Sequence, residues 1–144
     1  GLCTAKDRAA IDTAVKVKHD KRARADESLR LALRTGPRVA IDATFTAAMS
    51  EVERKSLGRQ LSRAYAVNRA AERPFGLYVC GYSPGDAGTF APDGYDRWVI
   101  EKLPQEACAH FPLEEIIYLT PDSPNTLDSP VLDERAVYVI GGLV

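Results

Sequence analysis

Four short apolar segments, separated by stretches that favour helices, constrain the fold of this chain more than any other feature of its sequence. They are RVAID (38–42), FGLYVC (75–80), EIIYL (115–119) and AVYVI (136–140). Apolar strands that alternate with helices are typical of a parallel sheet covered on both faces. We therefore predict an α/β fold with a mostly parallel sheet, helices on both faces, and the order helix, strand, helix, strand, helix, strand, loop, strand.

Three segments have the composition of helices. Residues 5 to about 34 contain few helix breakers, and the glycine and proline of RTGPR end this segment. The second helix is expected to begin at a capping box formed by Ser50 and Glu53 and to run to about Glu72. A short third helix is predicted over PQEACAHF (104–111).

Charge is distributed unevenly along the chain. Residues 1–38 hold ten Lys and Arg against five Asp and Glu, a net charge of +5, whereas residues 39–144 hold nine against fifteen, a net charge of −6. A basic segment ahead of an acidic body is typical of nucleic-acid proteins, because phosphate contacts supply affinity. A merely solvated helix with scattered charge is the alternative. We divide the chain into a basic helical arm (1–37) and an α/β domain (38–144).

The second predicted helix separates its arginines from its apolar side chains. At about 100° per residue, four arginines fall within an arc of roughly 120°: Arg59, Arg63, Arg69 and Arg73. Four other residues fall on roughly the opposite side: Leu57, Leu61, Ala64 and Tyr65. The leucines and Tyr65 are expected to pack on the sheet and the guanidiniums to face solvent, where they suit phosphate oxygens. A plain amphipathic helix would show the same division.

Polar and small residues follow the predicted strands at the end where α/β sheets bind ligands. Thr120, Asp122, Ser123 and Asn125 crowd into the loop TPDSPN, and Gly141-Gly142 follow the last strand. The first strand ends in Asp42. Hydroxyls, a carboxylate and a closely approachable glycine backbone suit a small polar ligand. A simple turn is the other interpretation of the two glycines.

Several common functions lack their motifs. There is no G-x-G-x-x-G, no P-loop and no G-x-S-x-G, which disfavours dinucleotide binding, P-loop and hydrolase activities. Cys3, Cys80 and Cys108 are isolated, as are His19 and His110, so no disulfide framework or zinc site is indicated. No apolar run approaches the roughly 18–20 residues that span a membrane. We expect an intracellular, reduced protein without a membrane segment.

Three segments in order resemble the tRNA (guanine-9-N1)-methyltransferase family. They are QLSRAYAVNRAAERPFGLYVCG, FPLEEIIYLTPDSPNTL and YVIGGLV, within residues 38–144. That family belongs to the SPOUT class of knotted S-adenosylmethionine enzymes, and the match is closest to its metazoan 10B-type branch. The basic arm fits the lysine- and arginine-rich leader usual in the family.

The resemblance implies methyl transfer from the cofactor S-adenosylmethionine to N1 of the purine at tRNA position 9, and leaves open whether that purine is guanine or adenine. Three residues match the family's cofactor-contacting positions: Leu119, Thr120 and Gly142. Three match helix positions associated with tRNA binding: Gln60, Arg63 and Arg69. Asn68 lies on the apolar side of the helix and is interpreted as packing. We expect a monomer whose partner is tRNA, in the nucleus or cytoplasm rather than the mitochondrion.

The end of the chain departs from the family pattern. In the family an aspartate, the general base, follows the GGLV turn at once, and further cofactor loops and the knot come after it. Here the chain begins at Gly1 and ends at Val144, so we interpret it as part of a longer protein and assign no catalytic residue within it. A positioned base contributes roughly 10²–10⁴-fold in rate. The 144-residue chain alone is therefore expected to be inactive, and its parent protein to be a methyltransferase.

Two alternatives to an enzyme remain open. One is a non-catalytic tRNA- or RNA-binding module, such as a truncated isoform that uses the basic arm and the arginine side of the second helix. The other is a general α/β nucleotide-binding domain without a role in RNA binding. An aspartate directly after residue 144 in the parent protein distinguishes the enzyme from the binding module.

Overall fold

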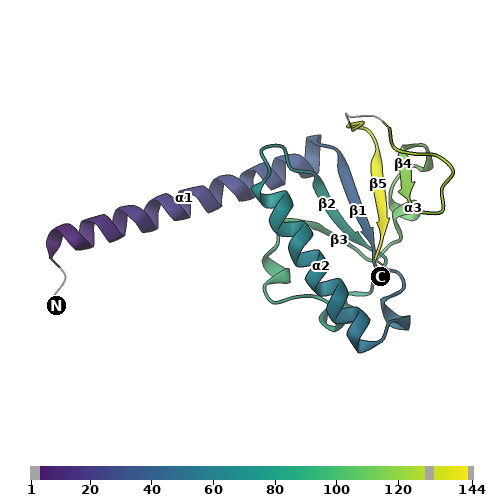
Figure 1. Ribbon diagram of the computed structural model, residues 1–144, viewed down its shortest axis with the longest axis horizontal. Helices are drawn as coiled ribbons and strands as arrows, with labels where there is room; N and C mark the ends of the chain where they lie inside the picture. The colour runs from purple at the N-terminus through teal and green to yellow at the C-terminus, as the bar shows by residue number, and fades with distance from the viewer. Residues whose placement is uncertain (1–3, 129–131, 143–144) are drawn as a thin grey trace.

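The computed structural model describes residues 4–128 and 132–142, which form one parallel sheet and the helices around it (Figure 1). The helices are α1 (Ala5–Thr35), α2 (Glu51–Ala70) and α3 (Ala107–His110). The strands are β1 (Arg38–Asp42), β2 (Gly76–Cys80), β3 (Glu101–Leu103), β4 (Ile116–Leu119) and β5 (Val137–Gly141). Their order across the sheet is β3-β2-β1-β5-β4, and every adjacent pair is parallel. The predicted α/β class is confirmed.

One strand was missing from the predicted order. β3 covers Glu101, Lys102 and Leu103, so two of its three side chains are charged and no apolar segment marks it. It forms an edge of the sheet by pairing with β2 over three residues only. A short edge strand has one open side and little burial, which explains why its sequence lacks the signal of the other four.

The two faces of the sheet are covered by different elements. One face presents Val39, Ile41, Leu77 and Val79, against which α2 packs. The opposite face presents Ala40, Tyr78, Val137 and Val139, covered by Ala107 and Phe111 from α3 and the residue that follows it. β1 lies at the centre of the sheet because it pairs with β2 on one side and with β5 on the other, and its alternate residues contribute to both cores.

Helix α2 begins and ends as its sequence predicts. The Ser50 N–H donates to Glu53 Oε2 at 2.6 Å and the Glu53 N–H donates to Ser50 Oγ at 3.2 Å, which is the expected capping box. Near the other end, Asn68 Nδ2 donates to the Phe75 carbonyl at 2.9 Å, and the Phe75 N–H donates to Asn68 Oδ1 at 2.7 Å. The interpretation of Asn68 as a packing residue is confirmed, because this side chain fixes the chain leading into β2.

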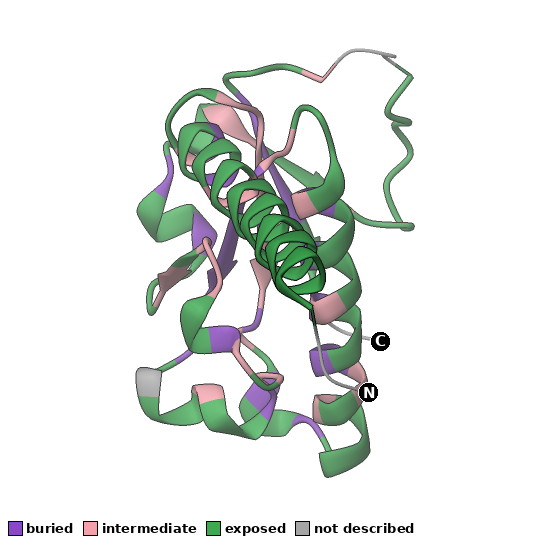
Figure 2. Cartoon of the chain, turned by 90° about the vertical axis from the view of Figure 1, so that its left-hand side faces the viewer, coloured by how far each residue is buried: buried purple, intermediate pink, exposed green. Residues whose placement is uncertain are grey.

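Helix α1 is the predicted basic helix, and most of it projects from the body of the protein (Figure 1). Residues 4–24 are all exposed, whereas Leu29 and Ala32 are buried (Figure 2). Tyr78 Oη donates to the Leu33 carbonyl at 3.2 Å, so the last third of α1 packs on β2. Among residues 4–128 and 132–142, no helix combines the length and apolar character needed to cross a membrane.

We predict that Gly76→Ala weakens this packing. A Cβ atom at Gly76 would lie 2.8 Å from the Ala32 carbonyl oxygen, so α1 or β2 must shift. We expect the free energy of unfolding to fall by about 1–3 kcal/mol, measured by urea denaturation followed by circular dichroism. Gly88→Ala is the matched control, because a Cβ there meets open space among the described residues. Equal stability of the two variants would contradict the close packing of α1 on β2.

Candidate functional site at the ends of the parallel strands

The sheet has a switch point beside β1. The chain leaves β1 towards β2 on one side, and β5 lies on the other side. In open α/β sheets, ligands bind beyond the carboxyl ends of the strands at such a point. Here that position is formed by Asp42 at the end of β1 and by Gly141 and Gly142 at the end of β5.

Gly142 passes unusually close to β1. Its N–H donates to the Asp42 carbonyl at 2.8 Å, and a Cβ atom at Gly142 would lie 2.6 Å from that oxygen and 3.4 Å from Leu57 Cδ1. Only glycine allows this approach without a shift of the backbone. At Gly141, by contrast, an added Cβ would meet among the described atoms only the Tyr118 hydroxyl, at 3.8 Å. Gly142 is thus required by packing, and the exposed Gly141 leaves open space at the strand end.

The Asp42 carboxylate links the ends of β1 and β4. Its Oδ1 accepts hydrogen bonds from the N–H of Thr44, at 2.9 Å, and from the Thr44 hydroxyl. Its Oδ2 accepts from the Tyr118 hydroxyl at 3.5 Å. Burial raises the pKa of Tyr118, and the negative charge of Asp42 raises it further, so this phenol stays protonated and donates. The sequence pointed to Asp42 as a strand-end residue but missed Tyr118, which the strand order brings to it.

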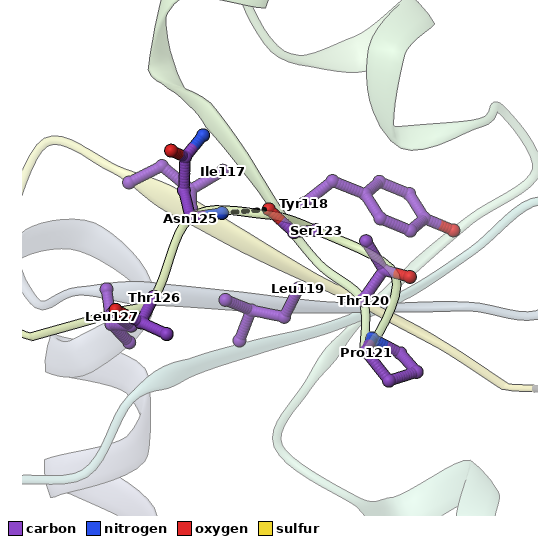
Figure 3. Close-up of a pocket in the computed structure, with 9 residues that line it drawn as sticks. All are labelled: Ile117, Tyr118, Leu119, Thr120, Pro121, Ser123, Asn125, Thr126 and Leu127. Carbon is purple, nitrogen blue, oxygen red and sulfur yellow. Dashed lines mark hydrogen bonds between the residues drawn. The ribbon is translucent and has the colours of Figure 1, made fainter.

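The predicted cofactor residues lie on adjacent strand ends. Leu119 pairs with Ile140 in the register of β4 and β5, so Thr120 follows beside Gly141. Leu119 and Thr120 line a hollow of about 680 Å³ formed by residues 117–127 (Figure 3). Thr120 Oγ1 accepts the Asp122 N–H at 3.3 Å, and the loop therefore turns back at once. Leu143 and Val144, the end of the GGLV segment, lie outside the described residues.

The cysteines have separate environments. Cys80 is fully buried, and burial together with the nearby Asp42 raises its pKa to about 12. It is therefore a protonated packing residue at neutral pH and no nucleophile. Cys108 is exposed, and Cys3 lies outside the described residues. Within residues 4–128 and 132–142, no three His, Cys, Asp or Glu side chains gather as metal ligands would.

Two of the predicted tRNA-binding residues are exposed on α2. Gln60 Nε2 donates to Ser56 Oγ at 3.3 Å within the helix. Arg63 lies on an apolar groove of about 420 Å³ that runs between α2 and the sheet and reaches Ile140 of β5. Ala64 also lines this groove and is exposed, whereas Leu57, Leu61 and Tyr65 are buried, as expected. The helix packs over β1 and β2 and leaves this side uncovered.

The environment of the Arg69 side chain differs from the predicted one. The guanidiniums of Arg59, Arg63 and Arg73 belong to exposed residues, but Arg69 turns towards α1 and forms an ion pair with Asp26. It also donates to the Tyr65 hydroxyl at 3.4 Å and to the Arg22 carbonyl at 3.3 Å. Burial lowers the pKa of Arg69, but the hydrogen bonds to Tyr65 and Asp26 outweigh it, and the pKa is raised overall. The expectation that all four guanidiniums face solvent was wrong, because α1 packs beside α2 at this position.

A family model described as tRNA (guanine(9)-N(1))-methyltransferase TRM10/TRM10A matches residues 4–144 of the chain. The rat protein named tRNA methyltransferase 10 homolog B is 37% identical over 134 residues, covering 88% of this chain and 42% of the rat protein. The human homolog B is 34% identical, covering 85% of this chain and 40% of the human protein. The chain thus spans about two fifths of the length of these curated relatives.

Solved structures with a similar fold are also Trm10 proteins. The structure of spTrm10(74) superposes with a TM-score of 0.68 and 26% identity, covering 76% of this chain and 61% of that one. Full-length spTrm10 in complex with SAH gives a TM-score of 0.64 and 26% identity, covering 76% and 65%. A Trm10 from Thermococcus kodakaraensis, at 21% identity and a TM-score of 0.59, shares the fold. The parallel sheet of this chain is the sheet of these methyltransferases.

Proposed function

Since this chain belongs to the tRNA (guanine(9)-N(1))-methyltransferase TRM10 family, we propose that its protein transfers a methyl group from S-adenosylmethionine to N1 of guanine at position 9 of tRNA. The observation that carries the proposal is the family match over residues 4–144, which includes every residue of the candidate site. The similar structure of spTrm10 with SAH supports the choice of cofactor.

The strand ends of the described chain fit such a cofactor. Open space at Gly141 and the hollow beside Leu119 and Thr120 leave backbone groups and a hydroxyl accessible on two adjacent strands, and the close passage of Gly142 over β1 holds these strand ends in place. We assign Leu119, Thr120 and Gly142 to cofactor binding. When bound, S-adenosylmethionine supplies a methyl group activated by its positively charged sulfur. Adjacent parallel strand ends are where α/β proteins bind nucleoside ligands.

The proton on N1 of guanine must leave as the methyl group is attached. Asp42 accepts hydrogen bonds from Thr44 and Tyr118, and we assign its carboxylate to holding the ends of β1 and β4 together. The family resemblance places the base directly after Val144. We therefore propose that the 144-residue chain by itself transfers no methyl group, since a positioned base contributes roughly 10²–10⁴-fold in rate.

The tRNA surface that we propose combines α1 with the exposed side of α2. The projecting part of α1 carries exposed lysines and arginines, and Gln60 and Arg63 are exposed on α2. Leu57, one turn before Gln60, lies against Gly142, so the same helix covers the candidate cofactor site. Phosphate contacts from such a surface position an RNA without reading its bases. An RNA-binding role without catalysis is the second candidate, because all of these residues lie within the 144 residues.

A methylation assay tests the proposed activity. The full-length product of the gene, incubated with S-adenosylmethionine and a tRNA transcript that has guanosine at position 9, is expected to form 1-methylguanosine at that position, mapped by mass spectrometry. A transcript with uridine at position 9 is the control, and one with adenosine tests the choice of purine. Binding of tRNA without methylation would favour the RNA-binding module, and no tRNA binding at low salt would favour a general nucleotide-binding domain.

The salt dependence of tRNA binding tests the role of Arg63. If its guanidinium neutralises one phosphate, Arg63→Ala makes the slope of log affinity against log salt shallower by about one unit. Arg135→Ala removes the same charge from an exposed residue that precedes β5 and belongs to neither α1 nor α2. We expect this control to leave the slope unchanged. Identical slopes for the two variants would remove Arg63 from the tRNA surface.

A further inference from the structure

We propose that Arg69 is a positioning residue for tRNA binding: by pairing with Asp26 it holds the basic helix α1 at a fixed angle to α2, and it does not contact the RNA. This inference rests on the proposed function, since it concerns how the tRNA surface is assembled. It reassigns a residue that the family resemblance associates with tRNA binding.

The pair lies where α1 leaves the body of the protein. Every residue from 4 to 24 is exposed, and Asp26 is among the first residues of α1 to be partly covered. The side chains of Arg69 and Asp26 are only 28% and 32% exposed, unlike the open pair of Arg30 and Glu27 within α1, at 55% and 70%. A half-buried ion pair between two helices holds them more firmly than one exposed within a single helix.

The Arg69 guanidinium is occupied by protein groups. One of its terminal nitrogens serves Asp26 and the Tyr65 hydroxyl, and the other donates to the Arg22 carbonyl of α1. To bind a phosphate, Arg69 would have to release Asp26, leaving a partly buried carboxylate unpaired beside the RNA. Arg63 requires no such exchange, since it is exposed.

Tyr65 extends the contact into the body of the protein. Its ring stacks on Trp98, with centroids 4.4 Å apart and planes 7° from parallel. Its hydroxyl also accepts the Val99 N–H at 3.1 Å. Arg69 thus connects α1 to a side chain that is held by both stacking and a hydrogen bond. The connection is rigid on the α2 side, so the Asp26 contact restrains the angle of α1 in addition to the packing of Leu29 and Ala32 on the sheet.

The length of α1 makes this angle important. Residues 5–24 extend about 30 Å beyond the contact at 1.5 Å per residue, and Lys16, Lys18 and Lys21 lie on this part. A rotation of about 10° at Asp26 therefore moves the far end of α1 by about 5 Å and these lysines by about 1–3 Å. Two linked binding elements reinforce each other only when their geometry allows both to bind at once. Loss of the contact is expected to weaken tRNA binding through α1, although no phosphate contact is removed.

The variant Asp26→Asn distinguishes positioning from direct contact by the sign of its effect. It removes a negative charge and frees Arg69, so direct contact with RNA predicts equal or tighter tRNA binding. The positioning role predicts binding about three- to tenfold weaker, measured by fluorescence anisotropy with a tRNA transcript at low salt. Glu27→Gln is the matched control, because it removes the same charge next to Asp26 without breaking an interhelical contact. We expect it to bind equally or slightly more tightly.

A second measurement separates positioning from misfolding. Hydrogen exchange of the α1 amides in residues 22–35 is expected to quicken in Asp26→Asn, while exchange in β1 and β2 stays unchanged. The double variant with the two charges swapped, Asp26→Arg and Arg69→Asp, is expected to restore both slow hydrogen exchange and tRNA affinity. If the wild-type chain binds no tRNA at low salt, this result contradicts the proposed function itself. Wild-type binding with equal or tighter binding by Asp26→Asn would contradict only the positioning role.

Discussion

The close pairing of β5 with β1 is the constraint on which the rest of the structure depends. β5 lies about 95 residues after β1, yet it pairs along the whole of β1 and places Gly142 against the Asp42 carbonyl. A side chain at Gly142 would separate the two strands. Because β4 takes its register from β5, this contact also fixes Leu119 and Thr120 beside Gly141, and Tyr118 beside Asp42. The candidate site therefore exists only when this parallel pair has formed.

Helix α2 connects the two proposed binding surfaces. Leu57 lies against Gly142, Arg63 faces the groove that reaches Ile140, and Arg69 is paired with α1. Residues at the start, middle and end of α2 thus contact the candidate cofactor site, the groove and α1 in that order, while Leu61 and Tyr65 are buried on the sheet. The first turns of α2 thus lie near the strand ends where the methyl donor is proposed to bind, and its last turns lie near α1.

Local signals in the sequence predicted the local structure. The four apolar strands, the capping box at Ser50 and the packing role of Asn68 each depend on neighbouring residues, and all are present. The errors have tertiary causes. The charged edge strand β3 gains its place from pairing with β2, and Arg69 is engaged because α1 packs beside it. A helical wheel shows one helix in isolation, so it cannot include a neighbouring helix.

The central claim, that the ends of β4 and β5 bind S-adenosylmethionine, is tested most directly by hydrogen exchange of the full-length gene product with and without S-adenosylhomocysteine. S-adenosylhomocysteine, the reaction product, is used because it occupies the cofactor site without turnover. Our account predicts slower exchange in the peptides that contain Leu119, Thr120 and the segment from Ile140 to Gly142, with no change in residues 5–24 of α1. Ligand-induced protection confined to other parts of the protein, with neither strand end affected, would contradict it.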